Sequence, residues 1–399
     1  MIYLDHNATA PLSPVARKAW LDAHEHCWHN PSSPYRPASK ARVRLEEARL
    51  TLAGMMDLCD PQRLLFNSGA TEGNNTIIHY YARHNKANAG TLLISPIEHA
   101  SLTEAIKSHW FGRVETLPVD SDGCVSPADL VKRLNQHHQP KPTLVSLMAA
   151  NNETGVRQEW LECAKICREH QLPFHCDASQ WLGRLPLSGL ANCDWVTASV
   201  HKCGGPRNVG ILIRPSSVNG LSLIAGGGQE NGQRGGTEDL PGILAMLAAL
   251  QNIADVPSRE ASARARDAFE KEVCDNITGC FILGKTAPRL WNTSAMILPM
   301  REQHQWLNAL EQHDILASSG SACAGHRIGG TGSHVPLAMG LSPEQSRHLL
   351  RFSAGSETTS ADWQQAAKAL VAIFKKWQNN KKSHPKGYSE LTHVINIPE

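Results

Sequence analysis

Short apolar, β-branched runs recur between residues 63 and 214, and each ends in a cluster of polar side chains followed by a segment of helical character. This alternation predicts an α/β fold with a mostly parallel sheet flanked by helices. The predicted strands cover residues 64–66, 91–94, 144–148, 173–175, 195–198 and 210–213. Because parallel strands present their carboxyl ends at one edge of the sheet, we expect the functional residues directly after these runs.

The pattern changes after residue 216. A glycine-rich stretch over residues 225–237 predicts a structured loop, and an apolar segment over 241–254 predicts a helix. Alternating acidic, basic and alanine residues predict another helix over 259–271, which leads into a second, smaller α+β domain. We therefore expect a large domain over residues 15–255 and a small domain made of residues 1–14 and 256–399.

The composition fits a globular protein, with 41% hydrophobic and 19% charged residues in a chain of 399. The formal net charge is only +2 and no basic stripe is present, so we expect no direct nucleic-acid partner and no membrane partner. The longest apolar stretch, residues 243–250, is much shorter than the roughly 20 residues of a membrane span. The first residues lack a basic signal region, and eleven irregularly spaced cysteines favour reduced thiols, so we expect a cytoplasmic protein.

The polar clusters after the first three predicted strands carry candidate ligands for a small molecule. Small residues over 67–75, with Thr71 among them, could cradle a phosphate or simply cap a helix. His99 could stack on a flat cofactor or be an ordinary surface histidine. Asn152 could donate a hydrogen bond to a ligand or only build a turn, so each of these signals is weak by itself.

The next two strand ends are more informative. Asp177 directly follows apolar residues, where a carboxylate needs a partner such as a pyridinium nitrogen, an arginine or a helix cap. Lys202 lies in a tight turn beside His201, Ser199 and two glycines, where a desolvated lysine can act as a Schiff-base nucleophile. A phosphate cradle, a stacking ring, a polar donor, an acid and a lysine on separate strand ends together predict a site for pyridoxal 5'-phosphate.

The same segments carry a family resemblance that runs nearly from end to end. The chain contains, in order, Y-L-D-H-N-A-T-A-P, H-N-P-S-S, S-G-A-T-E-G-N-N, N-N-E-T-G, D-A-S-Q, S-V-H-K, R-G-G-T, S-S-G-S-A-C and R-F-S. It resembles the cysteine desulfurases, pyridoxal-phosphate enzymes of fold type I in the class V aminotransferase group. The resemblance implies that the small domain carries a catalytic cysteine loop.

The resemblance also assigns roles at the cofactor site. It implies that Lys202 holds pyridoxal phosphate as a Schiff base, that Asp177 pairs with the ring nitrogen, and that His99 stacks on the ring. Thr237 would reach the phosphate of a neighbouring subunit, which implies a homodimer. The remaining residues that would bind the phosphate or the polar ring substituents are Ala70, Thr71, Asn152, Gln180, Ser199 and His201.

Cys323 follows S-S-G-S-A in a run of small residues, where a thiol is accessible. The resemblance implies that this thiol takes sulfur from L-cysteine and leaves L-alanine and a persulfide. The sulfur then passes to an acceptor protein, for which iron–sulfur cluster assembly is one of several pathways. Arg351 would grip the substrate carboxylate through a two-point contact, and Asn30 and Asn152 would also contact the substrate.

Three other functions remain open. A related pyridoxal-phosphate enzyme could act on selenocysteine or cleave the C–S bond of another amino acid. A cofactor-free thiol hydrolase could pair Cys323 with His326. A homologue without activity could serve as a sulfur-delivery scaffold.

The chain also departs from the family pattern. Asn208 stands where the family usually has glycine, Cys203 abuts the lysine, and Pro336 replaces a residue that is usually aliphatic. These changes leave the choice of substrate open.

Two groups of cysteine and histidine residues invite a metal-site interpretation. The spacing of the histidines and cysteine at positions 24, 26, 27 and 29 fits no standard zinc pattern, so we predict no metal site there. Cys163 and Cys167 lie one helical turn apart and are expected to pack in the core.

Overall fold

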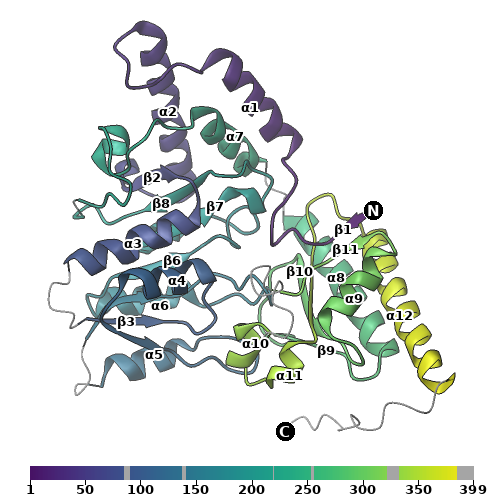
Figure 1. The fold of residues 1–399 in the computed structure, drawn as a ribbon. Coiled ribbons are helices and arrows are strands. Elements are labelled where there is room, and N and C mark those ends of the chain that lie inside the picture. The colour runs from purple at the N-terminus through teal and green to yellow at the C-terminus, as the bar shows by residue number, and fades with distance from the viewer. Residues whose placement is uncertain (85–89, 137–140, 219, 253–255, 321–331, 384–399) are drawn as a thin grey trace.

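The computed structural model describes residues 1–84, 90–136, 141–218, 220–252, 256–320 and 332–383. A seven-stranded sheet and a three-stranded sheet, each with its own helices and hydrophobic cluster, lie side by side (Figure 1). The amino-terminal segment runs along the second of these parts before it enters the first.

The large sheet has the order β2-β8-β7-β6-β5-β3-β4. All pairings among β3 to β7 are parallel, and only β8 runs antiparallel to its neighbours β2 and β7. The strands are β2 (Leu64–Asn67), β3 (Thr91–Ile94), β4 (Arg113–Thr116), β5 (Pro142–Ser146), β6 (Phe174–Asp177), β7 (Trp195–Ser199) and β8 (Gly210–Ile213). The predicted mostly parallel α/β sheet is therefore confirmed.

Every apolar run that predicted a strand forms one, but two details differ from the prediction. Strand β4 was missed because it lies at the sheet edge, where most of its residues are exposed and the sequence Arg113–Thr116 shows no apolar run. The segment between β7 and β8 contains only a short 3-10 turn, η3 (Val200–Lys202), so these two strands pair antiparallel.

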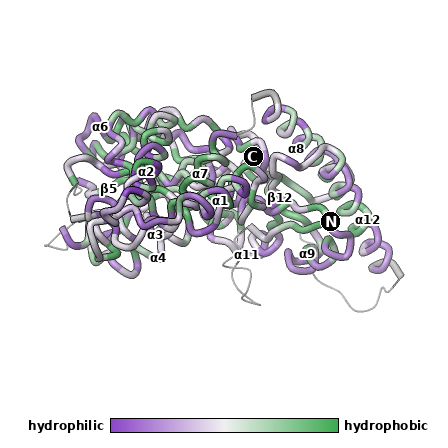
Figure 2. The backbone as a smooth tube through the Cα atoms, turned by 90° about the horizontal axis from the view of Figure 1, so that it is seen from above, coloured by the Kyte–Doolittle hydropathy of each residue, from purple (hydrophilic) through white to green (hydrophobic). Residues whose placement is uncertain are grey.

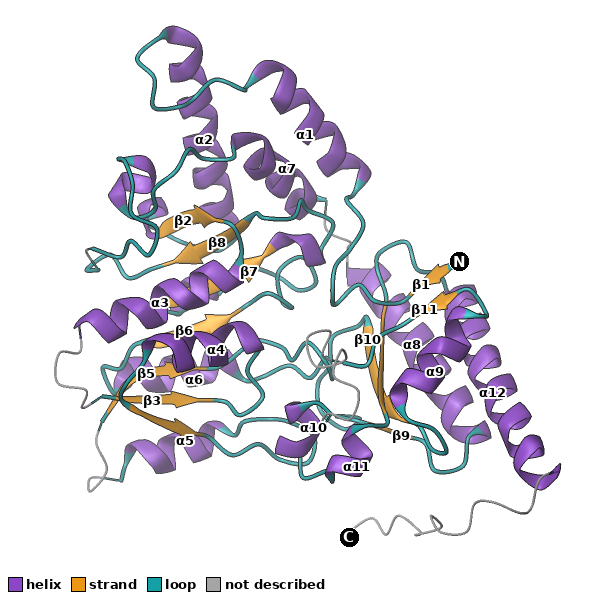
Figure 3. Cartoon of the chain, viewed as in Figure 1, coloured by secondary structure: helices purple, strands orange, loops and turns teal. Residues whose placement is uncertain are grey.

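Helices cover both faces of the large sheet (Figure 3). Leu65 and Leu92 pack with α3 and α4 on one face, while Leu64 and Leu93 pack with α2, α6 and α7 on the other, as alternating strand residues require. The helices are α1 (Pro14–His26), α2 (Arg36–Met55), α3 (Ala70–His84), α4 (Ala100–His109), α5 (Pro127–Leu134), α6 (Trp160–Glu169) and α7 (Leu240–Gln251). Short 3-10 turns lie at η1 (Pro61–Arg63), η2 (Leu190–Asn192) and η4 (Gln229–Gly232).

The second part is built around an antiparallel sheet of order β12-β10-β9. Its strands are β9 (Phe281–Ile282), β10 (Thr293–Ile297) and β12 (Leu349–Ser353), and β1 (Ile2–Tyr3) pairs in parallel with β11 (Ile315–Leu316). Its helices are α8 (Val256–Asn276), α9 (Gln303–Glu311), α10 (His334–Ala338), α11 (Pro343–Ser346) and α12 (Ser360–Ser383). Helices α7 and α8 confirm the helices predicted over 241–254 and 259–271, while the domain limits after residues 14 and 255 stay predictions.

Apolar segments concentrate inside both parts (Figure 2). None of the helices in the described part of the chain combines the length and the apolar composition that a membrane crossing requires.

Candidate active site

Asp177 ends strand β6 as a buried carboxylate. Its Oδ1 accepts a hydrogen bond from the Ser179 backbone N–H at 3.0 Å, and its Oδ2 accepts one from the Asn74 side chain at 3.1 Å. Burial alone would raise the pKa of Asp177, but the hydrogen bonds from Ser179 and Asn74 outweigh it and hold the pKa below its ordinary value. The strand end therefore presents a negative charge inside the protein.

Lys202 is the last residue of the η3 turn, which follows β7. Strand β7 is the neighbour of β6, the strand that ends at Asp177. Its backbone carbonyl accepts a hydrogen bond from Arg184 at 3.0 Å, which fixes the turn. The preceding residue, His201, contacts the Thr9 hydroxyl through Nδ1 at 3.1 Å. Burial and the charge of Lys202 lower the pKa of His201 to about 4, so its ring is neutral at physiological pH.

His99 is the N-cap residue of α4, and its Nδ1 accepts the Ser101 backbone N–H at 3.0 Å. Burial and the nearby Lys202 charge lower the pKa of His99 to about 4. In the neutral ring this hydrogen bond places the proton on Nε2. His99 is therefore a neutral ring with one fixed donor nitrogen, close enough to Lys202 and Asp177 to respond to both charges.

The turn between β2 and α3 approaches the end of β7 closely. The backbone N–H of Ala70 donates to the Ser199 hydroxyl at 2.8 Å. Gly69 has φ +137°, and a Cβ at that position would lie 2.9 Å from the Ser199 Oγ, so the turn requires glycine. Thr71 is exposed in the first turn of α3, at the helix end where a phosphate is favoured.

Gln180 and Asn152 both contact Asn7 of the amino-terminal segment. The buried Gln180 donates through Nε2 to the Asn7 carbonyl at 3.0 Å, and the Asn7 side chain donates to the Asn152 carbonyl at 3.2 Å. The Gln180 Oε1 is buried and has no hydrogen-bond partner among the described residues. Such an acceptor calls for a donor from a ligand.

Arg351 lies on β12 and is 2% exposed. Its Nη2 pairs with the Asp5 carboxylate at 2.6 Å, and its Nη1 donates to the carbonyls of Asn152 at 2.9 Å and Gly320 at 2.6 Å. Its buried Nε has no partner in the described part of the chain. The arginine predicted to bind substrate thus links the small sheet to the turn at Asn152, and its Nε donor has no partner among the described residues.

Two predicted residues do not join this group within one chain. Asn30 is exposed on the loop between α1 and α2, where its side chain accepts only the local Ser32 backbone N–H at 2.9 Å. Thr237 is exposed in the loop before α7. Cys323 and the alternative partner His326 lie outside the described residues.

A family model of class-V aminotransferases matches residues 2–365. The chain belongs to the aminotransferase class-V family.

Its relatives in this family are named cysteine desulfurases. The chain is 31% identical to the cysteine desulfurase IscS of Dictyoglomus turgidum, over 96% of this chain and 99% of that protein. The NifS-like protein of Rickettsia africae has a solved structure that is 30% identical, with a TM-score of 0.82, covering 94% of this chain and 99% of that one. A structure of SspA in complex with cysteine is 26% identical, with a TM-score of 0.76, covering 90% and 100% of the two chains.

The residues present fit the cofactor on which the class-V family depends. Asp177 keeps a buried negative charge that suits a protonated ring nitrogen, and Gln180 offers an unused acceptor. The Ser199 hydroxyl lies beside the start of α3, at the helix end where an anion is favoured. Pyridoxal phosphate therefore has a chemically suitable site at the carboxyl edge of the large sheet.

Several residues that shape this site were missed from the sequence. Arg184 is buried, and it joins the carbonyls of Gln180, His6 and Lys202 and the side chain of Asn7. Asn74 orients Asp177 from α3. Asn74 lies in the family segment A-T-E-G-N-N and Arg184 follows D-A-S-Q by four positions, but nothing local showed that these side chains turn inward.

Two buried glutamates were also missed. Burial raises the pKa of Glu98 to about 8, and its Oε1 accepts the Met148 backbone N–H at 2.8 Å. Burial likewise raises the pKa of Glu153, whose Oε2 would lie 2.8 Å from a Cβ at position 320. In the sequence these acids look like ordinary turn residues of P-I-E-H and N-N-E-T-G.

The departures from the family pattern have local explanations. Asn208 adopts φ +60°, a left-handed conformation that asparagine tolerates better than most residues. Pro336 lies in the first turn of α10, where its missing N–H leaves no helix bond unmade. Cys203 donates to the Val200 carbonyl at 3.2 Å and packs against Gly183, and burial raises the pKa of its thiol to about 11. None of the three changes the strand-end residues.

The two groups of cysteines and histidines that were considered as metal ligands lie in α6 and in or just after α1. Cys163 and Cys167 are fully buried in α6, as predicted. His24 and His26 bind the carbonyls of Trp20 and Asp22 one turn earlier in α1.

Proposed function

We propose that this class-V protein is a cysteine desulfurase that takes sulfur from L-cysteine and stores it as a persulfide. The observation that carries the proposal is the similarity to named cysteine desulfurases over nearly the whole length of both chains. The charged and neutral groups at the carboxyl edge of the large sheet support the same chemistry.

Each residue has a definite task in this proposal. The Lys202 amine holds pyridoxal phosphate covalently and afterwards moves a proton at the substrate carbon that bears the amino group. Asp177 holds the ring-nitrogen proton, His99 covers the ring, and Arg351 binds the substrate carboxylate. The remaining contacts to the cofactor come from Ala70, Thr71, Asn152, Gln180, Ser199 and His201.

Bound pyridoxal phosphate supplies an electron sink that stabilises negative charge on the α-carbon of the substrate, which bears the amino group. The Cys323 thiolate attacks the substrate sulfur, so an S–S bond forms while the C–S bond breaks. The electron pair of that bond stays with the β-carbon of the substrate, which takes up a proton and becomes the methyl group of alanine. The balance is L-cysteine plus a thiol giving L-alanine plus a persulfide.

The partners follow from the same proposal. Thr237 and Asn30 are exposed and do not join the other site residues within one chain. Both could instead contact a second subunit in a homodimer. A sulfur-acceptor protein receives the persulfide sulfur, in iron–sulfur cluster assembly or another thiolation pathway. The cytoplasm is the compartment in which we place these steps.

The decisive experiment incubates the purified protein with pyridoxal phosphate and L-cysteine and measures alanine, protein-bound persulfide and sulfide after reduction. Equal amounts of alanine and sulfur are expected. A Cys323→Ser variant should keep the yellow colour and lose sulfur release, while Cys59→Ser, at an exposed cysteine outside the site, should behave as wild type. Full activity in Cys323→Ser would refute the persulfide step.

The same assay separates the alternatives. Much faster turnover of L-selenocysteine than of L-cysteine would identify a selenocysteine lyase. A colourless protein that cannot take up pyridoxal phosphate would favour the thiol hydrolase. Cofactor binding without turnover of either substrate would favour the scaffold.

A further inference from the structure

A pair of cysteines lies outside the site described above, in the part built around the three-stranded sheet. Cys274 is near the carboxyl end of α8, and Cys280 directly precedes β9. Their Sγ atoms are 3.5 Å apart, although six positions separate them in the chain. Both side chains are partly exposed.

The turn between them holds this geometry. Ile277 N donates to the Val273 carbonyl at 2.9 Å, and Cys280 N donates to the Ile277 carbonyl at 3.0 Å. Gly279, with φ +89°, reverses the chain in a conformation that favours glycine. Both cysteines also pack against the hydrophobic cluster of this part, which holds their side chains beside each other.

The two thiols are not equivalent. The hydrogen bond from Cys280 and the charge of Lys285 lower the pKa of Cys274, although burial opposes them. The same hydrogen bond, together with burial, raises the pKa of Cys280. The carboxyl end of α8 disfavours an anion, so Lys285 and the Cys280 S–H supply the stabilisation that Cys274 needs as a thiolate.

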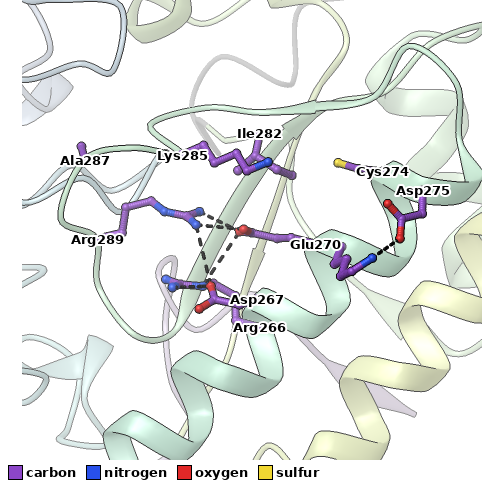
Figure 4. Close-up of a pocket in the computed structure, with 10 residues that line it drawn as sticks. Arg266, Asp267, Glu270, Cys274, Asp275, Ile282, Lys285, Ala287 and Arg289 are labelled. Atoms are coloured by element: carbon purple, nitrogen blue, oxygen red, sulfur yellow. Dashed lines mark hydrogen bonds and ion pairs between the residues drawn. The ribbon is translucent and has the colours of Figure 1, made fainter.

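Cys274 also faces a small-molecule-sized pocket of about 350 Å³ (Figure 4). Lys285 and Ile282 line it beside the sulfur, and Arg289 pairs with Glu270 on the opposite wall at 2.6 Å. None of the strand-end residues lines this pocket. A reagent can therefore reach Cys274 without entering the proposed active site.

We propose that Cys274 and Cys280 form a redox-active dithiol that small-molecule disulfides oxidise to a reversible intramolecular disulfide, with Cys274 attacking first. This site is independent of the proposed desulfurase chemistry. Two core thiols that merely touch would share the short distance, but neither of them would line an open pocket as Cys274 does.

The exchange balances in two steps. The Cys274 thiolate attacks one sulfur of the disulfide, whose S–S bond breaks and releases one thiolate. Cys280 then loses its proton and attacks the Cys274 sulfur, the mixed disulfide breaks, and a second thiol leaves with that proton. Two protein thiols are oxidised and one small disulfide is reduced to two thiols.

The test exposes the reduced full-length protein to glutathione disulfide, blocks free thiols in acid, and maps the peptides by mass spectrometry. A peptide pair linked through Cys274 and Cys280 is expected, and dithiothreitol should reverse it. Burial raises the pKa of Cys163 to about 12, so Cys163 serves as the internal comparison. Cys274 lines a pocket whereas Cys163 is fully buried, so Cys274 should be modified while Cys163 stays free.

Three variants test the order of attack. Cys280→Ser should accumulate glutathione on Cys274, Cys274→Ser should leave Cys280 unmodified, and the exposed Cys59→Ser should not change the bridge. The proposal fails if Cys274 and Cys280 stay free under conditions that modify Cys59 in the wild type. It also fails if Cys280 in Cys274→Ser reacts as fast as Cys274 in Cys280→Ser.

Discussion

At the carboxyl edge of the large sheet, Asp177 and His99 are each held by the residue two positions further along the chain, through Ser179 and Ser101. Arg351, on the small sheet, is held by Asp5, which lies 346 positions away, and by the carbonyl of Asn152, 199 positions away. The first region combines local turns with one distant partner, Asn74 of α3, which donates to Asp177, whereas the Arg351 contacts come only from distant segments. Local turns survive many substitutions elsewhere, whereas the arginine needs both parts of the molecule in place.

The largest effect is expected from breaking the local region at Lys202→Ala. Loss of the only predicted attachment point should remove the covalent yellow cofactor and reduce turnover by roughly 1,000-fold or more. Visible absorbance and alanine release measure both. Lys165→Ala, at an exposed lysine on α6, is the matched control and should remain yellow and active. Borohydride trapping of the cofactor on another lysine would contradict the assignment.

Asp177→Asn tests the charge at the same edge without changing its shape. A neutral amide cannot hold the ring-nitrogen proton, so kcat should fall by roughly 100-fold while the fold is retained. Steady-state kinetics with L-cysteine checks this. Asp194→Asn is the control because Asp194 accepts the Phe174 N–H at 2.9 Å, at the opposite end of strand β6. A similar loss of kcat in both variants would show that the effect is structural.

Asp5→Ala breaks the long-range region instead. It leaves the buried Arg351 charge without its carboxylate, which should lower the free energy of unfolding by about 1–3 kcal/mol and raise KM more than it lowers kcat. Urea denaturation and kinetics measure these quantities. Glu302→Ala removes a solvent-exposed partner of Arg347 and should cost less than about 1 kcal/mol. Equal costs for the two variants would remove the distinction between the regions.

The pH dependence of stability separates two adjacent buried groups. His99 has a lowered pKa of about 4, so its unfolded form binds the extra proton and its contribution is lost as pH falls below about 6.5. Glu98 has a raised pKa of about 8, so its contribution is present below about 4.5 and lost as pH rises through 8. The two oppose each other between about pH 4.5 and 6.5, and above about 6.5 only the Glu98 contribution keeps falling.

Variants therefore reveal what the wild-type curve hides. When the pH falls from 7.5 to 5, the free energy of unfolding of His99→Gln should rise by about 1–2 kcal/mol relative to wild type. When the pH rises from 5 to 8, that of Glu98→Gln should rise by about 2 kcal/mol relative to wild type. Urea unfolding at these pH values is the measurement. Parallel curves for all three proteins would show that neither group titrates as its burial requires.

The smallest effect is expected at Asn208, beyond the strand-end turn. Its φ of +60° costs alanine about 1 kcal/mol, so Asn208→Ala should destabilise by that amount, while Asn208→Gly should stay within about 0.5 kcal/mol of wild type. Thermal denaturation resolves the difference. An alanine variant as stable as wild type would mean that the turn relaxes out of the left-handed conformation.

Most of the large sheet could be predicted because its strands are continuous apolar runs, which parallel strands buried on both faces require. Strand β4 could not, because an edge strand exposes most of its residues. The candidate residues at the strand ends could also be predicted, because a parallel sheet places the residues directly after each apolar run at one edge. Asn74 and Arg184 were not found, because their roles depend on which way a helix or turn faces.

The sequence by itself determined the α/β alternation and the candidates at the strand ends, since both follow from local pattern and spacing, and its motifs carry the family resemblance. The tertiary structure decided which of these candidates share a site and what charge they carry. It placed Asp5 and Asn152 against Arg351 and aligned Cys274 with Cys280. The physical reason is that pKa values and ion pairs depend on burial and on partners distant in the chain, and only the folded arrangement supplies both.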